Sequence, residues 1–414
     1  MSQSIRVFRR LCKSLALTIL IVSVLQLVGI GAWADENFSA TTAITLPNGQ
    51  KITSFDISFV DPVIGIYVLA DRTNKSVDVV DTGSNTVLVQ LKATPAFAGA
   101  TGNTDTSGPD GVLIVDHREA WVGDGNSTIK VIDLFSQATT HVISTGGAKR
   151  ADELCYDPRD HLVLMANDAE SPWPFVTFVS TKTYSVTGRI TMDGTNGTPK
   201  ATNGIEQCQW SRRTGKFYVN IPEVNGPGND TQPGAVLVIS PQTMKVEKTF
   251  TIPLGVCAGP QGMAIGPENQ ILLGCNDPNR TAPSTVVIDE HSGAVIHVLA
   301  GEDGSDQVWF NDGDDHYLLA RSGGSNPQKL GIADAQTGKE DASVTIGLPN
   351  NPPTSPHGTN HSVAADPVMN QVYVPIASTS GSAICGSLGG SDAQGCIAVF
   401  TAAGDDRQRA QNEH

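Results

Sequence analysis

The sequence has little of several features on which whole classes of protein depend. Charged residues make up 17% of its 414 residues and aromatic residues 6%, which is not the composition of a disordered polyelectrolyte or a coiled coil. No stretch shows a convincing apolar period of 3.6 residues, so helices should be scarce. Basic residues are the rarer charge, 27 against 42 acidic ones. Because nucleic-acid phosphates have to be met by clustered cations, we expect no nucleic-acid partner.

A long hydrophobic run occurs only once, at residues 15–30. Four basic residues precede it, and Ala32-Trp33-Ala34 follows with small residues at the two positions that a signal peptidase reads. This order predicts that residues 1–34 are a signal peptide; the alternative, a membrane anchor, would need a run of about 20 residues. Cleavage would remove four basic and no acidic residues and change the net charge from −15 to −19. We therefore expect a periplasmic or extracellular (secreted) protein with no membrane contact after cleavage.

Cysteine is also sparse, with seven residues, one of which lies in the predicted signal peptide. The other six form no Cys-x-x-Cys pair and have no histidine at zinc-ligand spacing, so we expect no structural zinc. An even number of cysteines in an exported protein indicates disulfide bonds. Six cysteines allow fifteen pairings, and only the fold can choose among them.

Short strand-like runs separated by turns are abundant, and glycine and proline, which favour turns, number 42 and 24. An apolar, β-branched run that mostly ends in a polar residue occurs seven times, at residues 77–81, 129–133, 176–180, 236–240, 286–289, 330–334 and 397–401. An apolar hairpin partner and a tight turn lie upstream of each run, and the turns are 41 to 55 residues apart. Four strands per unit at this period predict an all-β fold over residues 35–404, a seven-bladed β-propeller with four-stranded antiparallel blades.

The two ends of the repeat array complement each other. The seventh unit has no fourth strand, because the chain beyond it is polar, and we expect residues 405–414 to be a disordered tail. A spare strand, residues 42–46, precedes the first unit. We predict that this N-terminal strand pairs with the last blade and closes the ring, which limits exposed sheet edges.

The first unit carries a family resemblance. Its runs at residues 66–68, 77–81 and 85–87 (IYV, VDVVD and NTV) resemble the YVTN-type repeat of bacterial exported β-propellers, and the resemblance covers residues 40–404. Related propellers include lactonases, dehydrogenase subunits and surface-layer proteins, so the resemblance implies a fold and an exported location but no single activity.

The repeat also suggests how the cysteines pair. Cys155 and Cys208 occupy equivalent places on the innermost strands of adjacent units, within disulfide reach. Cys257 precedes the innermost strand of the fifth unit and Cys275 ends its second strand, while Cys385 and Cys396 flank one Gly/Ser-rich loop. We predict these three pairs; free buried thiols are the alternative.

The predicted ring brings acidic residues to one mouth of its central channel. The position five residues before each turn begins an innermost strand, and the seven residues there are Asp56, Gly111 (beside Asp110), Asp152, Glu206, Gln261, Asp306 and His361. Calcium prefers six to eight oxygen ligands from carboxylates, amides and backbone. We therefore predict a cation, Ca²⁺, at this mouth with Asp56, Asp152, Glu206 and Asp306 as metal ligands.

A second series of polar residues, at the ends of the second strands, includes Arg72 and Arg321 and converges on the same face. With Gln261 we take these two as ligand-binding residues for a partner that is an unknown small molecule or protein. Two alternatives stay open: a solvated channel lining without function, and an anionic pocket for a cationic or polyhydroxylated ligand. The loops at residues 93–108, 225–234 and 349–359 are rich in turn-forming residues and are either partner contacts or variable surface.

Two functions are compatible with this mouth. The first is a binding or interaction protein with an acidic, cation-binding channel mouth. The alternative is a lactonase-like, metal-dependent hydrolase in which the cation polarises a carbonyl and His361, oriented by Asp306, is the general base. Calcium-dependent lactonase propellers use a Glu/Asn/Asn/Asp ligand set, which the predicted ring does not match. Since no nucleophile–base pair is evident either, the binding function is the better prediction.

Overall fold

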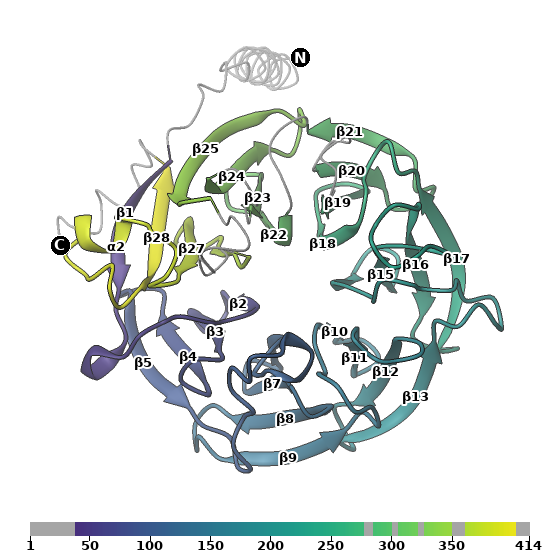
Figure 1. Ribbon diagram of the computed structural model, residues 1–414, viewed down its shortest axis with the longest axis horizontal. Helices are drawn as coiled ribbons and strands as arrows, with labels where there is room; N and C mark the ends of the chain where they lie inside the picture. The colour runs from purple at the N-terminus through teal and green to yellow at the C-terminus, as the bar shows by residue number, and fades with distance from the viewer. Residues whose placement is uncertain (1–37, 277–284, 300–304, 322–326, 350–360, 403–414) are drawn as a thin grey trace, which may run out of the picture. The chain divides into compact units, whose positions relative to one another are not determined.

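Seven four-stranded antiparallel sheets are arranged in a ring (Figure 1), which confirms the predicted seven-bladed β-propeller. The computed structural model describes residues 38–276, 285–299, 305–321, 327–349 and 361–402. The predicted signal peptide and polar tail, and all but residue 349 of the predicted 349–359 loop, lie outside these ranges. In the first six blades the strands follow one another from the axis outward in chain order.

The first three blades have strands of four to seven residues. Blade 1 comprises β2 (Ser58–Asp61), β3 (Ile66–Asp71), β4 (Ser76–Asp81) and β5 (Thr86–Leu91). Blade 2 comprises β6 (Val112–Val115), β7 (Glu119–Asp124), β8 (Thr128–Asp133) and β9 (Thr139–Ser144). Blade 3 comprises β10 (Leu154–Asp157), β11 (Leu162–Asn167), β12 (Phe175–Ser180) and β13 (Ser185–Thr191).

The next three blades repeat this order. Blade 4 comprises β14 (Cys208–Ser211), β15 (Lys216–Ile221), β16 (Gly234–Ser240) and β17 (Lys245–Ile252). Blade 5 comprises β18 (Pro260–Ile265), β19 (Gln270–Cys275), β20 (Thr285–Asp289) and β21 (Val295–Leu299). Blade 6 comprises β22 (Ser305–Asn311), β23 (His316–Arg321), β24 (Gln328–Asp334) and β25 (Glu340–Gly347).

Blade 7 combines the two ends of the ring. It contains β26 (Ala364–Asp366), β27 (Gln371–Ile376) and β28 (Cys396–Ala402), and its outermost strand is β1 (Phe38–Ile44). The predicted closure by an N-terminal strand is therefore confirmed, although β1 begins and ends earlier than the predicted 42–46. Its register runs from Phe38 opposite Ala402 to Ile44 opposite Ile397.

Helical structure is confined to three short segments in the described residues: η1 (Pro47–Gly49), η2 (Thr104–Thr106) and α2 (Ile384–Ser387). In this part of the chain no helix has the length and apolar character needed to cross a membrane.

The polar residue that ends most of the seven sequence runs has a structural role in the turn that follows. The Asp81 carboxylate accepts the amide of Ser84 at 2.7 Å, and Asp133 accepts that of Ser136 at 2.8 Å. Asp334 does the same for Thr337 at 2.6 Å. An aspartate that bonds backbone amides two or three residues ahead fixes a tight turn. These aspartates thus recur because the first six blades need a similar turn between the third and fourth strands.

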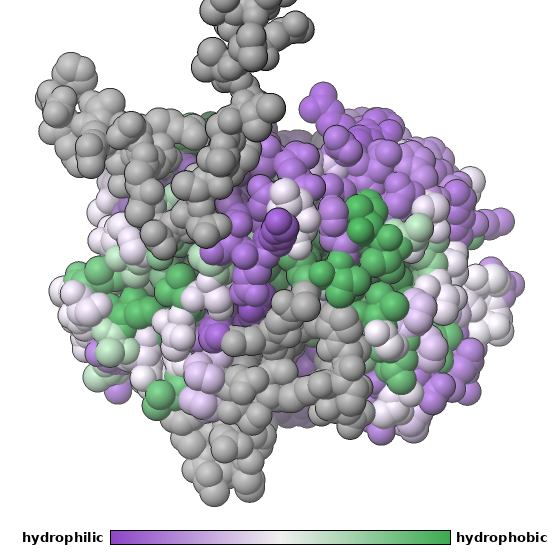
Figure 2. Space-filling model, turned by 90° about the horizontal axis from the view of Figure 1, so that it is seen from above, coloured by the Kyte–Doolittle hydropathy of each residue, from purple (hydrophilic) through white to green (hydrophobic). Residues whose placement is uncertain are grey.

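Burial decreases from the inner strands to the rim of the ring. The second strand of a blade is buried along its whole length, as in β3 and β11, or at all but its first residue, as in β7 and β15. The outermost strands β9 and β17 consist mostly of exposed and partly exposed residues. A half-exposed outer strand packs one face on the blade and leaves the other in water. Figure 2, which looks at the ring edge-on, accordingly shows hydrophilic and hydrophobic residues side by side.

All three predicted cysteine pairs form disulfides. Cys155–Cys208 joins blades 3 and 4, Cys257–Cys275 lies within blade 5, and Cys385–Cys396 closes the loop before β28. Their Cα–Cα distances are 5.7, 5.4 and 5.8 Å. Disulfides persist in oxidising compartments, and these three are consistent with an extracellular or periplasmic environment.

Candidate cation site at the centre of the ring

The residues predicted to line the mouth come together in two acidic clusters. Asp56 and Asp152 lie with Asp110 in the first cluster, and Glu206 and Asp306 lie with Glu153 in the second. Within each cluster, one oxygen atom from each residue lies within 4.8 Å of the others. Each cluster draws on three different blades, because equivalent positions of the innermost strands meet around the axis.

Two arginines neutralise much of the first cluster. Arg72 follows β3 and donates to both Asp56 and Asp110, with its Nε 2.9 Å from Asp110 Oδ1. Arg150, in the loop before β10, contacts Asp152 Oδ2 at 2.9 Å and forms two bonds with Asp168, at 2.6 and 3.1 Å. Both guanidinium groups are largely buried. The guanidinium groups of Arg72 and Arg150 thus already occupy the positions where a cation would contact these aspartates.

Burial and charge act against each other on the pKa values of this cluster. Burial would raise the pKa of Asp56, but Arg72 and His361 outweigh it and hold that pKa below its ordinary value. Burial raises the pKa of Asp110 and of Asp152 well above the ordinary value despite the arginines. Asp110 is completely buried, and its Oδ2 has no hydrogen-bond partner among the described residues. The first cluster therefore holds more carboxylates than its two arginines can compensate.

The second cluster has no direct ion-pair partner in the described residues, although the charge of Arg150, and for Asp306 also that of His361, acts on it from a greater distance. Within the described residues no side chain or backbone group forms a hydrogen bond or ion pair with the carboxylates of Glu153, Glu206 or Asp306. Burial raises the pKa of each of the three, and their mutual repulsion adds to that effect for Glu153 and Glu206. Only 6% of Glu153 is exposed. Three nearby acids in this environment favour either bound protons or a bound cation.

His361 contacts Phe55 and Asp56, while Asp306, the residue predicted to orient it, acts on it through its charge. Its ring stacks on Phe55 with centroids 5.1 Å apart, and its Nε2 lies 3.0 Å from Phe55 O and 3.2 Å from Asp56 Oδ1. Burial lowers the pKa of His361, but the bond and charge of Asp56 and the charge of Asp306 outweigh it, so the pKa is raised. The ring links blade 7 to blade 1.

The predicted ligand-binding residues lie in different surroundings. Arg72 belongs to the first cluster. Arg321 is buried at the end of β23, and its Nη1 bonds Glu340 of β25 at 3.0 Å. Its guanidinium passes over Gly331, where a Cβ would lie 2.7 Å from Nε, so Arg321 extends along its own blade. Gln261 is partly exposed on β18, and its backbone carbonyl accepts the Asn220 amide at 2.8 Å.

Arg150 is the member of this site that sequence reasoning missed. It lies two residues before Asp152, outside every predicted strand. Its partner Asp168 directly follows a predicted strand and could be placed by the repeat. The position of Arg150 in a loop has no periodic pattern that would place its side chain near the axis.

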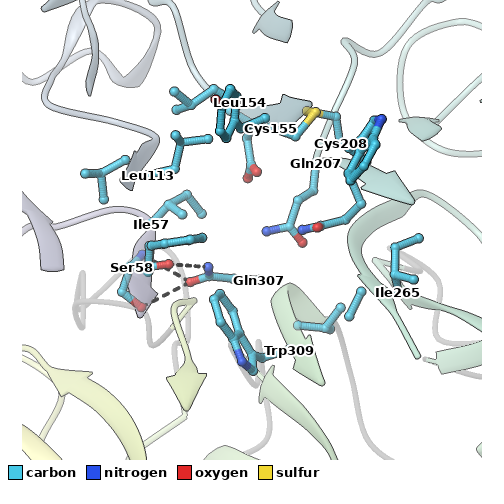
Figure 3. A pocket seen from close by; sticks show the side chains of 18 of the residues that line it. Ile57, Ser58, Leu113, Leu154, Cys155, Gln207, Cys208, Ile265, Gln307 and Trp309 are labelled. Carbon is cyan, nitrogen blue, oxygen red and sulfur yellow. Dashed lines mark hydrogen bonds between the residues drawn. A yellow bond between two sulfur atoms is a disulfide. The ribbon is translucent and has the colours of Figure 1, made fainter. Parts of the chain in front are cut away.

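An axial cavity of about 400 Å³ lies among the innermost strands (Figure 3). Glu153, Gln207 and Gln307 are its polar lining near the start of these strands, and Trp309 lines it further along β22. Gln307 is fully engaged: its Nε2 donates to Ser58 O at 2.7 Å, and its Oε1 accepts from the Ser362 hydroxyl at 2.7 Å and the Val363 amide at 3.1 Å. It thereby ties blade 6 to blades 1 and 7.

The tryptophans differ in how they use the core. Trp121 is wholly buried, as expected for core packing. Trp210 and Trp309 are partly buried; each packs against the core on one side and lines the axial cavity on the other.

Fold and site together define the class: a seven-bladed β-propeller with two acidic clusters among its innermost strands. Comparison of the chain with protein-family models and with curated proteins found no match.

Proposed function

We propose that this protein is an exported binding protein that holds a divalent cation, Ca²⁺, between Glu153, Glu206 and Asp306. The observation that carries the proposal is that three blades direct carboxylates to one point, and in the described part of the chain no basic side chain forms an ion pair with them. Calcium accepts such oxygen ligands in flexible geometry, and backbone groups or water complete its shell.

The sequence prediction divided the ligands differently. Asp56 and Asp152 were expected to share the metal with Glu206 and Asp306. Their cluster already contains the Arg72 and Arg150 guanidinium groups, so a second cation there would have to displace or repel them. We therefore assign Asp56 and Asp152 to the arginine network, and Glu153 takes their place in the proposed site.

Binding is also better supported than lactonase-like hydrolysis. A hydrolase of that kind needs a free base beside the cation. The Nε2 of His361 contacts Asp56 and Phe55 O, and its raised pKa favours the protonated form. A protonated, bonded imidazole is a poor proton acceptor, so the site favours holding a ligand over turning one over.

Export rests on two separate features. Residues 1–34 have the order of a secretory signal, and three disulfides match an oxidising compartment. The YVTN-type resemblance of the repeats points to the same location.

Isothermal titration of the mature protein with calcium chloride, after treatment with a chelator, tests the proposed cation site. We expect one calcium per chain, and at least tenfold weaker binding in Glu206→Gln and Asp306→Asn, because each removes a charged ligand. Glu268→Gln, which changes an exposed acid on a turn, is the matched control and should bind like wild type. Equal binding by wild type, Glu206→Gln and Asp306→Asn would overturn the proposal.

A further inference from the structure

The axial cavity combines one charged end with apolar walls. Glu153 belongs both to the second acidic cluster and to the lining of the cavity. Beyond it, toward the turns that end the innermost strands, the lining includes Leu113, Leu154, Ile265 and Trp309. Figure 3 shows these four side chains around the open centre, with Gln207 and Gln307 beside them. A volume of about 400 Å³ falls within the range of small-molecule sites.

The hydrogen-bonding groups that remain available at the polar end are few. The Oε1 of Gln307 accepts from Ser362 and Val363, and its Nε2 donates one hydrogen bond to Ser58 O. The Oε1 of Gln207 accepts the Met263 amide at 2.6 Å. The Glu153 carboxylate, by contrast, has no hydrogen-bond or ion-pair partner in the described part of the chain and is 6% exposed. A ligand at this end therefore meets the buried Glu153 carboxyl, the acidic group of the cavity lining, with the side-chain amide of Gln207 beside it.

The chemistry of the walls narrows the choice of ligand. An anion is excluded by Glu153 and by the neighbouring Glu206 and Asp306. A sugar needs many hydrogen-bonding partners, and most of this lining is aliphatic or aromatic. Aromatic faces attract organic cations, and apolar walls favour a ligand with an apolar body.

We propose that the axial cavity binds an organic amine, with its ammonium group on Glu153 and its apolar body between Trp309, Leu154 and Ile265. This site goes beyond the proposed calcium site, because the amine reaches Glu153 from the cavity and needs neither Glu206 nor Asp306 as a ligand. The two ligands share Glu153, so calcium and the amine compete.

Fluorescence and calorimetric titration of the mature protein in chelator, with 3-phenylpropylammonium as the probe, tests this site. We expect at least tenfold tighter binding than for the neutral analogue 3-phenylpropan-1-ol, which lacks the charge, and than for methylammonium, which lacks the body. Saturating calcium should weaken amine binding in the wild type. Equal affinity for the amine and the alcohol, or no binding of the amine, would overturn the proposal.

Three variants separate this proposal from the calcium site. Glu153→Gln, which is nearly isosteric, should bind both calcium and the amine at least tenfold more weakly. Glu206→Gln should bind calcium more weakly and bind the amine like wild type. Trp309→Ala should lose the amine and retain calcium, and its calcium binding shows that the ring is folded. Amine binding unchanged in Glu153→Gln contradicts the inference. A wild type that binds the amine without binding calcium leaves the inference standing and removes only the calcium site.

Discussion

At the residue scale, the centre of the ring contains more carboxylates than basic side chains: the two clusters hold six acids, and two arginines contact them. Arg72 contacts Asp56 and Asp110 of the first cluster, and Arg150 contacts Asp152 of that cluster and the nearby Asp168, whereas no arginine contacts the second cluster in the described residues. Breaking a buried ion pair leaves an uncompensated charge and costs far more than breaking an exposed one. The two clusters should therefore respond in opposite ways to the loss of a charge.

Replacing Arg72 with methionine should be strongly destabilising. Asp56 and Asp110 would remain buried without their guanidinium, and we expect a loss of about 3–5 kcal/mol in the free energy of unfolding. Chemical denaturation measures this difference. Arg118→Met is the matched control, since the Arg118 side chain is 65% exposed in its pair with Asp133, and it should unfold like wild type. If Arg72→Met changed the free energy of unfolding as little as Arg118→Met, the arginine network would not stabilise the centre of the ring.

The second cluster should make the calcium-free protein less stable as the pH rises. Folding raises the pKa of Glu153, Glu206 and Asp306 above the ordinary values of 4.5 and 3.8. The folded state then binds more protons than the unfolded state, so stability is greatest below those ordinary values and is lost as the pH rises through the raised ones.

Urea midpoints measured between pH 4 and 8 in chelator test this dependence. The slope should be smaller in Glu206→Gln and in wild type with calcium, while Glu268→Gln should retain the full slope. At pH 7 without calcium, Glu206→Gln should melt roughly 2 °C or more above wild type, by analogy with about 1 kcal/mol of relieved repulsion. A lower melting temperature would mean that Glu206 is stabilising in its charged form.

At the scale of elements, the seven blades resemble one another in their strands and differ in how they are joined. The strand runs and their terminal aspartates were readable from the sequence because every blade buries its middle strands and needs the same turn. The register at the axis was less readable. β18 and β22 each contain an irregularity next to the predicted positions, between Pro260 and Met263 and between Ser305 and Val308. Counting back five residues from each turn therefore finds most of the acids. It does not show that they form two separate clusters.

The disulfide between blades 3 and 4 should contribute more stability than the local one in blade 7. Cys155–Cys208 spans 53 residues and Cys385–Cys396 spans 11. On the chain-entropy account the longer loop is worth about 4 kcal/mol and the shorter about 3. Double serine variants of each pair, compared by urea denaturation, measure the difference. A larger loss from the shorter loop would contradict this order.

At the scale of the whole molecule, closure of the ring brings together acids that lie up to 250 residues apart, such as Asp56 and Asp306. The sequence predicted the number of blades, the closing strand and all three disulfides, because each follows from a pattern repeated along the chain. It predicted one shared mouth for Asp56, Asp152, Glu206 and Asp306, and the structure groups the first two with Asp110 and the last two with Glu153.

The parts of the site that sequence reasoning did not predict depend on side-chain direction. Arg150 reaches the first cluster from a loop, and Arg321 turns away along its blade to Glu340. Glu153, which the sequence placed beside the ring of acids, joins Glu206 and Asp306. A repeat specifies where a backbone position falls in the ring, but packing against neighbouring blades decides where a long side chain ends.

Diffraction from crystals of the mature protein grown with Tb³⁺, a calcium substitute whose anomalous signal locates the ion, tests the central claim most directly. We expect one ion on the axis with oxygens of Glu153, Glu206 and Asp306 about 2.3–2.6 Å away. An ion found only among acids on the outer surface, or an axis that holds water at saturating Tb³⁺, would contradict the cation site.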